Sequence, residues 1–319
     1  MFNDWKNDSR NEGWSIVKQS RRDFVKTGTA SLVGAAAVLH SSELFAKGLR
    51  LPLGLQLYSV RDLLPKDYAG TLKDLGGLGY REVESAGYYN HSAAEVGKAM
   101  SDANLKLVSA HYSYNDLSAK LDDVLDFNHG LGVSYLICSF PGKDPAGKKS
   151  AGSGRLAFTL DDWKWNAGQF NTLGDKVAAA GMKFGYHNHW MEFVETDGVV
   201  PYDELMHLTD PAKVTFEMDC GWVVVGGGKP VSYLKTYGKR ISMLHVKDFK
   251  LDDAAALAKH EPKPVELGQG GIDYRPIFAE AVKTANIQHV FVEQEAFTVP
   301  WMQSLTIDAD YMKKIGAAV

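Results

Sequence analysis

The sequence predicts a single α/β domain over residues 51–319, a closed (β/α)₈ barrel. Short apolar runs rich in β-branched residues alternate with longer segments of helical periodicity, which is typical of a parallel sheet covered by helices. The first run continues into Ser59-Val60-Arg61-Asp62 and lacks the glycine-rich turn that an open, doubly wound sheet usually places there. A chain of 319 residues, 45% of them hydrophobic, also has the usual size of one such barrel.

The expected strands are short runs in which Val, Ile, Leu and aromatic residues predominate. In chain order they are Leu53–Tyr58, Tyr80–Ser85, Leu105–His111, Ser134–Ser139, Lys183–His189, Val214–Asp219, Ile241–Val246 and His289–Gln294. Runs of this kind suit a parallel sheet that is buried on both faces.

Helices are expected between and after these strands, where apolar residues recur at intervals of three and four. They cover Lys66–Leu78, Ser92–Ala103, Ser118–Gly130, Leu160–Ala180, Tyr202–Leu208, Val231–Tyr237, Tyr274–Ala285 and Leu305–Ile315. Thr159 and Asp162 have the spacing of a capping box, which marks the start of the fourth helix.

Two connections are longer than a barrel needs, residues 140–159 and 249–271, and both follow the carboxyl end of a strand. The loops after the strands form the active-site face of this fold, so both are expected to border a site. The turn Gly268–Gly271 offers backbone N–H groups that are suited to an anion, although such a turn alone is weak evidence for phosphate.

The first fifty residues differ in kind from the rest. A charged leader precedes Ser20-Arg21-Arg22-Asp23-Phe24-Val25-Lys26, and a weakly hydrophobic run, Thr27–Leu39, follows. This arrangement resembles a twin-arginine export signal, which implies passage through the Tat translocase and a periplasmic or secreted protein. Residues 1–50 are then signal peptide and spacer, and the run is too short to remain as a membrane span. The alternative is an amphipathic N-terminal helix of a cytosolic protein.

Composition argues against one class of partner. The net charge of −4, from 35 basic and 39 acidic residues, provides no overall attraction to nucleic acid. The two cysteines, Cys138 and Cys220, lie in segments that read as apolar strands, so buried free thiols are expected rather than a disulfide or a catalytic cysteine.

Polar residues that do not help a barrel core collect at the carboxyl ends of the expected strands. They are Gln56, Tyr58, Glu84, His111, His187, Asn188, His189, Asp219, His245, Lys247, Asp248, Glu293 and Glu295. Burying so many ionisable groups costs free energy, and a bound cation is the simplest compensation. Because strand side chains alternate, Asp219, His245 and Glu293 are expected to converge. This oxygen and nitrogen donor set suits one divalent ion, Mn, Mg, Co or Zn, and does not separate them.

Several segments around these residues are similar to those of a known family. They are Phe184–Phe193 (FGYHNHWMEF), Phe216–Trp222 (FEMDCGW), Leu244–Asp248 (LHVKD), Gly268–Asp273 (GQGGID) and Val290–Gln294 (VFVEQ). From Leu53 to Ile315 the chain thereby resembles the sugar phosphate isomerase/epimerase family of xylose isomerase-like TIM barrels.

The resemblance implies one divalent ion at the barrel mouth, bound by groups from strands five to eight. Acting as a Lewis acid, the ion stabilises the enediolate that forms when a base removes the proton beside a carbonyl. Asp219, His245 and Glu293 match the family's ligand positions. Family epimerases have a glutamate on strand five, whereas this chain offers His187 or, five residues later, Glu192 as the remaining ligand.

Other residues at the same strand ends are candidates for further roles. His111, His189, Lys247 and Glu84 are expected to act as acids, bases or substrate-orienting groups, with a structural role as the alternative. Gln56, Tyr58, Trp190 and Trp222 are expected to bind substrate, since aromatic faces pack well against the C–H side of a sugar; capping of the barrel core is the alternative for the aromatic residues.

The first functional hypothesis is a metal-dependent isomerase or epimerase that removes a proton next to a carbonyl of a keto-sugar. Export favours unphosphorylated substrates. The alternative shares the first step but ends in β-elimination, as in a lyase or dehydratase acting on a 3-keto-glycoside or keto-inositol. A His-x-His pair on strand five resembles inosose dehydratase and favours this alternative. A non-catalytic sugar-binding barrel is a third hypothesis, and a homodimer is consistent with the resemblance.

Overall fold

The structure is a computed structural model that describes residues 48–147, 157–284 and 286–319. Most of the expected signal and spacer lies outside the described residues, so the export signal stays a prediction. The described residues belong to one compact unit. None of the helices within the described ranges combines the length and the apolar character that a membrane crossing requires.

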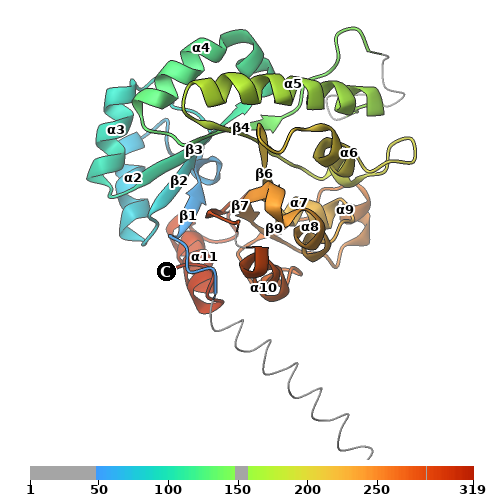
Figure 1. Cartoon of the computed structure of the whole chain (residues 1–319). Helices are drawn as coiled ribbons and strands as arrows, with labels where there is room; N and C mark the ends of the chain where they lie inside the picture. Colours follow the sequence, from blue (N-terminus) through green and yellow to red (C-terminus); the bar gives the residue numbers. More distant parts are fainter. Residues whose placement is uncertain (1–47, 148–156, 285) are drawn as a thin grey trace, which may run out of the picture. The chain divides into compact units, whose positions relative to one another are not determined.

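A closed parallel barrel forms the centre of the described residues and confirms the predicted fold class (Figure 1). Going round the barrel, the strands follow the order β1-β10-β7-β6-β5-β4-β3-β2, and β1 pairs with both β10 and β2. The bounds are β1 Gly54–Gln56, β2 Glu82–Ser85, β3 Lys106–Ser113, β4 Tyr135–Phe140, β5 Lys183–His187, β6 Val214–Asp219, β7 Ile241–Val246 and β10 His289–Val292.

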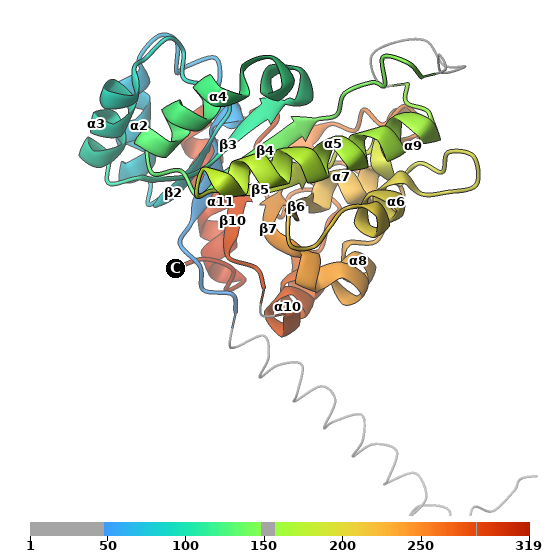
Figure 2. The ribbon, with the colours of Figure 1, turned by 45° about the horizontal axis from the view of Figure 1, so that its top comes forward.

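Helices cover the outside of the barrel, and α5 passes over β5 (Figure 2). The helices that match predicted ones are α2 Tyr68–Gly77, α3 Ala93–Asp102, α4 Tyr114–Gly130, α5 Leu160–Ala179, α6 Pro201–Leu208, α8 Pro230–Tyr237, α10 Tyr274–Thr284 and α11 Trp301–Lys314. The capping box that opens α5 is confirmed, because Thr159 Oγ1 accepts from the Asp162 N–H while the Asp162 carboxylate accepts from the Thr159 N–H.

Several elements were not predicted, and all but the turn at Gly238–Arg240, which joins α8 to β7, lie in connections after a strand. They are the 3₁₀ turns Leu57–Val60, Met191–Phe193 and Gly238–Arg240, the short helices α7 Cys220–Val225 and α9 Ala254–Ala258, and the antiparallel pair β8 Asp248–Phe249 and β9 Pro264–Val265. The first strand ends early because the Gln56 side chain accepts from the Tyr58 N–H and caps the following turn.

Both cysteines are buried and free, as predicted, but only one of them lies in a strand. Cys138 lies in β4, whereas Cys220 is the first residue of α7. Burial raises the pKa of the Cys138 thiol to about 12 and that of the Cys220 thiol well above its usual range, so neither is an activated nucleophile.

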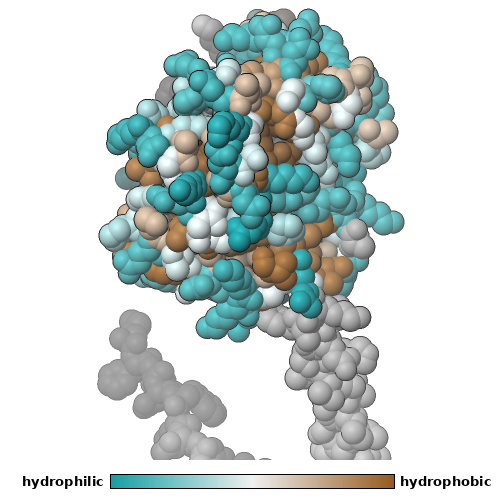
Figure 3. Space-filling model, turned by 90° about the vertical axis from the view of Figure 1, so that its left-hand side faces the viewer, coloured by the Kyte–Doolittle hydropathy of each residue, from teal (hydrophilic) through white to brown (hydrophobic). Residues whose placement is uncertain are grey.

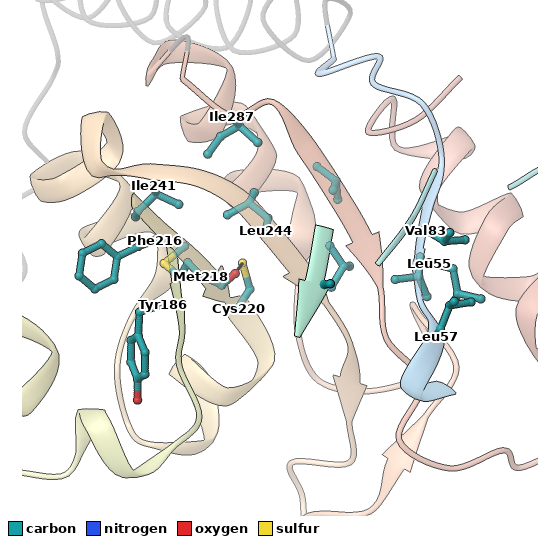
Figure 4. Packing of buried hydrophobic residues seen from close by; sticks show 14 of the residues in the cluster. Leu55, Leu57, Val83, Tyr186, Phe216, Met218, Cys220, Ile241, Leu244 and Ile287 are labelled. Atoms are coloured by element: carbon teal, nitrogen blue, oxygen red, sulfur yellow. Dashed lines mark hydrogen bonds between the residues drawn. The ribbon is translucent and has the colours of Figure 1, made fainter. Parts of the chain in front are cut away.

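Strand side chains alternate between the helices and the barrel interior. Tyr186, Phe216 and Leu244 belong to the hydrophobic cluster between strands and helices (Figure 4), and the Tyr186 ring lies 4.8 Å from that of Phe170 on α5. On the outermost surface, hydrophilic residues are interspersed with hydrophobic ones across the face shown in Figure 3.

The barrel interior has its own apolar layer, a second buried cluster of Val108, Tyr135, Ile137, Met243 and Phe291. Gly185 makes room for it on β5, because a Cβ there would lie 2.6 Å from Ile137 Cδ1. This layer blocks the barrel below its carboxyl end, so the ionisable residues above it are shielded from water on that side.

Candidate active site

A cavity of about 580 Å³ opens at the carboxyl ends of the barrel strands. Six of the predicted site residues line it, namely Tyr58, His111, His187, His189, Trp222 and Glu293. Its further lining residues are Ala86, Gly87, Tyr112, Ser113, Asp116, Ser139, Phe140 and Glu295. The volume is sufficient for a small-molecule ligand.

Four of the predicted metal ligands come together at the base of this cavity. His187, Asp219, His245 and Glu293, here named the outer group, each offer one ligand atom, and these atoms all lie within 4.8 Å of one another. His245 Nδ1 lies 3.0 Å from Glu293 Oε2, and Asp219 Oδ2 lies 4.0 Å from His187 Nε2. The predicted convergence of Asp219, His245 and Glu293 is therefore observed.

Local structure fixes Asp219 in this place. It is the last residue of β6 and the N-cap of α7, where its Oδ1 accepts from the Trp222 N–H at 2.8 Å. Its other oxygen, Oδ2, is buried and lacks a hydrogen-bond partner within the described ranges, although Lys247 Nζ lies 2.9 Å from it. One carboxylate thus shapes the loop and leaves an oxygen directed at the site.

Lys247 supplies a buried positive charge beside the outer group. Its Nζ lies 2.6 Å from Glu293 Oε2 and 2.7 Å from Glu295 Oε1, in addition to the contact with Asp219. Burial alone would lower the pKa of this ammonium, but the three carboxylates outweigh it and raise the pKa well above its usual range. The Tyr274 hydroxyl donates to the Lys247 carbonyl and accepts from its N–H, which fixes the backbone.

A second set of contacts lies deeper in the barrel. Glu84, His111, Glu217 and His245, here named the inner group, surround a point where Glu84 Oε1 and Glu217 Oε2 each contact both imidazole Nε2 atoms at 2.6–3.2 Å. Gln56 does not line the cavity; its Nε2 donates to Glu84 Oε1 at 2.7 Å. Sequence reasoning missed Glu217, although strand alternation from Asp219 points it into the barrel.

The histidines have contrasting pKa values because their neighbours differ. For His111, burial favours the neutral form, but Glu84 and Glu217 outweigh it and raise the pKa to about 9. Burial and the neighbouring His245 lower the pKa of His187 well below its usual range. Burial and the charge of Lys247 lower the pKa of His189 to about 3. His189 is therefore neutral at pH 7, and its buried Nδ1 has no hydrogen-bond partner among the described residues.

Glu192 lies outside both donor groups. Its Oε1 accepts from the Tyr186 hydroxyl at 2.5 Å, and its Oε2 accepts from the His189 N–H at 3.1 Å. Burial raises the pKa of this carboxyl to about 7. Of the two strand-five alternatives, the structure brings His187 into the outer group and uses Glu192 to hold the His189 loop.

The predicted aromatic substrate contacts divide into two kinds. Tyr58 and Trp222 line the cavity, and Lys247 Nζ lies 5.0 Å from the Trp222 ring centre. Trp190 does not line the cavity but stacks on His260, with ring centres 3.9 Å apart and planes 2° from parallel. Trp190 therefore joins two loops and does not face the cavity.

The glycine turn after β9 is occupied by a protein carboxylate. Asp248 accepts from the N–H groups of Gly268, Gly270 and Ile272 as well as from Phe249. A Cβ at Gly270 would lie 2.1 Å from Asp248 Oδ1, which explains the glycine. These N–H groups have their acceptor, so the anion-binding interpretation of this turn is wrong.

Comparison with known proteins places this arrangement among related barrels. A family profile described as xylose isomerase-like TIM barrel matches residues 72–315. The chain is similar to inosose dehydratases; that of Clostridium botulinum (strain Alaska E43 / Type E3) is 29% identical over 226 residues, 65% of this chain and 75% of that one. A sugar phosphate isomerase/epimerase of Parabacteroides distasonis has a similar structure, with a TM-score of 0.67, 28% identity and coverage of 83% and 98%. A structure of IOLI protein with a binding zinc atom shares the fold, at a TM-score of 0.65, 12% identity and coverage of 84% and 98%.

Proposed function

The chain belongs to the xylose isomerase-like TIM barrel family, and we propose that it is a divalent-metal-dependent lyase of that family. It removes the proton beside a carbonyl of a 3-keto-glycoside or keto-inositol and expels the group on the β-carbon. The similarity to inosose dehydratases supports this alternative over isomerisation or epimerisation, the first hypothesis from the sequence.

One observation carries the choice of elimination. A two-base epimerase needs an acidic group on each side of the sugar, so that one removes the proton and the other returns it from the opposite face. Here strand five presents His187 and His189 to the cavity, while both oxygens of Glu192 are bound to Tyr186 and the His189 N–H. The strand-five side therefore lacks the second carboxylate.

The protein groups suited to proton transfer differ in protonation state. The neutral His189 accepts the proton from the carbon beside the carbonyl, and the electron pair of that C–H bond forms a carbon–carbon double bond. The bond from the β-carbon to its oxygen breaks, and the departing oxygen takes a proton from the Lys247 ammonium. The products are an unsaturated ketone and water or an alcohol.

The outer group fits a divalent ion. Two imidazoles and two carboxylates form a mixed donor set that suits Mn, Mg, Co or Zn. Asp219 Oδ2 has no hydrogen-bond partner in the described ranges, although it lies 2.9 Å from Lys247 Nζ. His187, Asp219, His245 and Glu293 would hold such an ion, which would supply Lewis-acid polarisation of the substrate carbonyl. Trp222 and Tyr58 line the cavity beside these residues.

Two features favour an unphosphorylated substrate. The glycine turn has its N–H groups bound by Asp248 and offers them to no phosphate. The predicted export through the Tat translocase would place the protein in the periplasm or outside the cell, where oxidised glycosides are more available than sugar phosphates.

The test is a product assay. The metal-loaded full chain is incubated with 3-keto-glycosides and keto-inositols, and mass spectrometry follows release of the alcohol or loss of water. Asp219→Asn, which keeps an oxygen for the Trp222 N–H, serves as the matched variant. Release that depends on metal and on Asp219 supports the proposal; no release from any substrate while an epimer accumulates contradicts it.

A further inference from the structure

We propose that the inner group, Glu84, His111, Glu217 and His245, is a second divalent-cation site that shares His245 with the outer group. This site goes beyond the proposed elimination reaction, which uses none of the four inner ligand atoms as acid or base. Of the inner group, His111 lines the cavity.

The ligand atoms form a small ring in which nitrogen and oxygen alternate. Glu84 Oε1 lies 2.6 Å from His111 Nε2 and 2.8 Å from His245 Nε2. Glu217 Oε2 lies 2.7 Å from His111 Nε2 and 3.2 Å from His245 Nε2. The ligand atoms of His111, Glu217 and His245 also lie, with that of His187, within 4.8 Å of one another, which is close enough to surround one cation.

Hydrogen bonds alone leave this ring incomplete. Each imidazole Nε2 carries at most one proton, and an ionised carboxylate oxygen carries none. Since one N–H points well at a single acceptor, two protons serve two of the four short contacts. In the other two contacts, the proton on the nitrogen points at a different oxygen. A cation at the centre makes all four contacts favourable.

Glu217 provides an independent observation. Its side chain is fully buried, and its second oxygen, Oε1, has no hydrogen-bond partner in the part of the chain that the structure describes. Buried carboxylate oxygens without a partner are uncommon, and each calls for an explanation. A cation bound through both oxygens of this carboxylate would give Oε1 a partner. His187 Nδ1, 3.0 Å from Glu217 Oε2, is a further donor beside the same site.

His245 connects the two sites. Its Nδ1 lies 3.0 Å from Glu293 Oε2 of the outer group, and its Nε2 lies 2.8 Å from Glu84 Oε1 of the inner group. An imidazole without ring protons binds one cation through each nitrogen, so both sites are filled at once. Because each site offers two imidazoles and two carboxylates, Co²⁺ is a suitable probe ion for both.

The experiment counts ions. The full chain is stripped with a chelator and titrated with Co²⁺, while calorimetry gives the stoichiometry and visible absorption reports the ligand field. We expect two ions per chain. Glu217→Gln and His111→Asn should each weaken one binding event at least about 100-fold and leave the other. Glu293→Gln should weaken the other one. His289→Asn, a histidine variant at the opposite end of the barrel, should keep both.

The outcomes separate this proposal from the proposed function. One ion per chain that is lost in Glu293→Gln and kept in Glu217→Gln overturns the inner site and leaves metal-dependent elimination intact. No bound ion overturns both. The wild-type stoichiometry decides even where a variant fails to fold, and circular dichroism identifies such variants.

Discussion

The two ends of the barrel interior both pair histidine with glutamate, but in different ways. At the amino end, His289 Nδ1 lies 2.7 Å from Glu82 Oε2, and one ring nitrogen serves one carboxylate oxygen. At the carboxyl end, His111 and His245 each contact two carboxylates. The amino-end pair is satisfied by a single proton, whereas the carboxyl end has more acceptors than protons. This excess of acceptors is the difference on which the proposed inner cation site rests.

An apolar layer separates the two ends. Val108, Ile137, Met243 and Phe291 are all fully buried between them. Variants at one end are therefore expected to leave the other unchanged, which makes the amino end an internal control for the carboxyl end.

The largest effect is expected for Asp219→Asn. Loss of the charge weakens the outer cation site, and kcat/KM should fall at least about 10³-fold because Lewis-acid stabilisation of the developing charge is lost. Steady-state kinetics with metal analysis measures this. If the folded variant kept its activity, the carboxyl end of the barrel would not be the site of the reaction.

The next largest effect is expected for His189→Asn, which removes the proposed base. kcat should fall about 10²-fold to 10³-fold, while the metal content stays that of the wild type, since His189 lies outside both donor groups. Kinetics and metal analysis of the same preparation separate the two roles. Loss of metal together with activity would instead assign His189 to the ligand set.

A buried carboxylate outside both donor groups extends the comparison. Asp308 on α11 is fully buried, and burial raises its pKa to about 7, above an unfolded value of about 3.9. The folded chain holds this proton more tightly, so its contribution to stability is present below pH 4 and is lost as pH rises through 7.

Between pH 4 and pH 8, the free energy of unfolding of Asp308→Asn should therefore rise relative to that of the wild type by on the order of 3 kcal/mol. Urea denaturation at several pH values measures the difference. The Asn oxygen still accepts from the Leu267 N–H, which Asp308 Oδ1 accepts now. A difference that does not change with pH would contradict the shifted titration.

The smallest effect is expected at the amino end. His289→Asn should lower the free energy of unfolding by about 1 kcal/mol, because it breaks one partly exposed pair. Chemical denaturation and the elimination assay together check this. A loss of activity comparable with that of His189→Asn would show that the two ends are coupled.

The fold followed from the sequence because strand and helix periodicities are local, and each of the predicted strands overlaps an observed one. The outer group followed from strand alternation at Asp219, His245 and Glu293. What failed depends on contacts between distant residues. Nothing local shows that the Asp248 carboxylate fills the Gly268–Gly271 turn.

Two further placements show the same limit. Glu192 was a plausible ligand by spacing, yet Tyr186 and the His189 N–H bind its carboxylate. Glu217 could have been found by alternation from Asp219, but its partners Glu84 and His111 come from the opposite side of the barrel. The inner group could therefore be recognised only once the strands were arranged in the closed barrel.

The most direct test of the central claim is the fate of deuterium. The metal-loaded chain is incubated with a 3-keto-glycoside in D₂O, and nuclear magnetic resonance and mass spectrometry follow substrate and products. Elimination predicts release of the alcohol and an unsaturated ketone, with no epimer formed. Deuterium entering the carbon beside the carbonyl of an epimerised or isomerised sugar, without release of the alcohol, would contradict it.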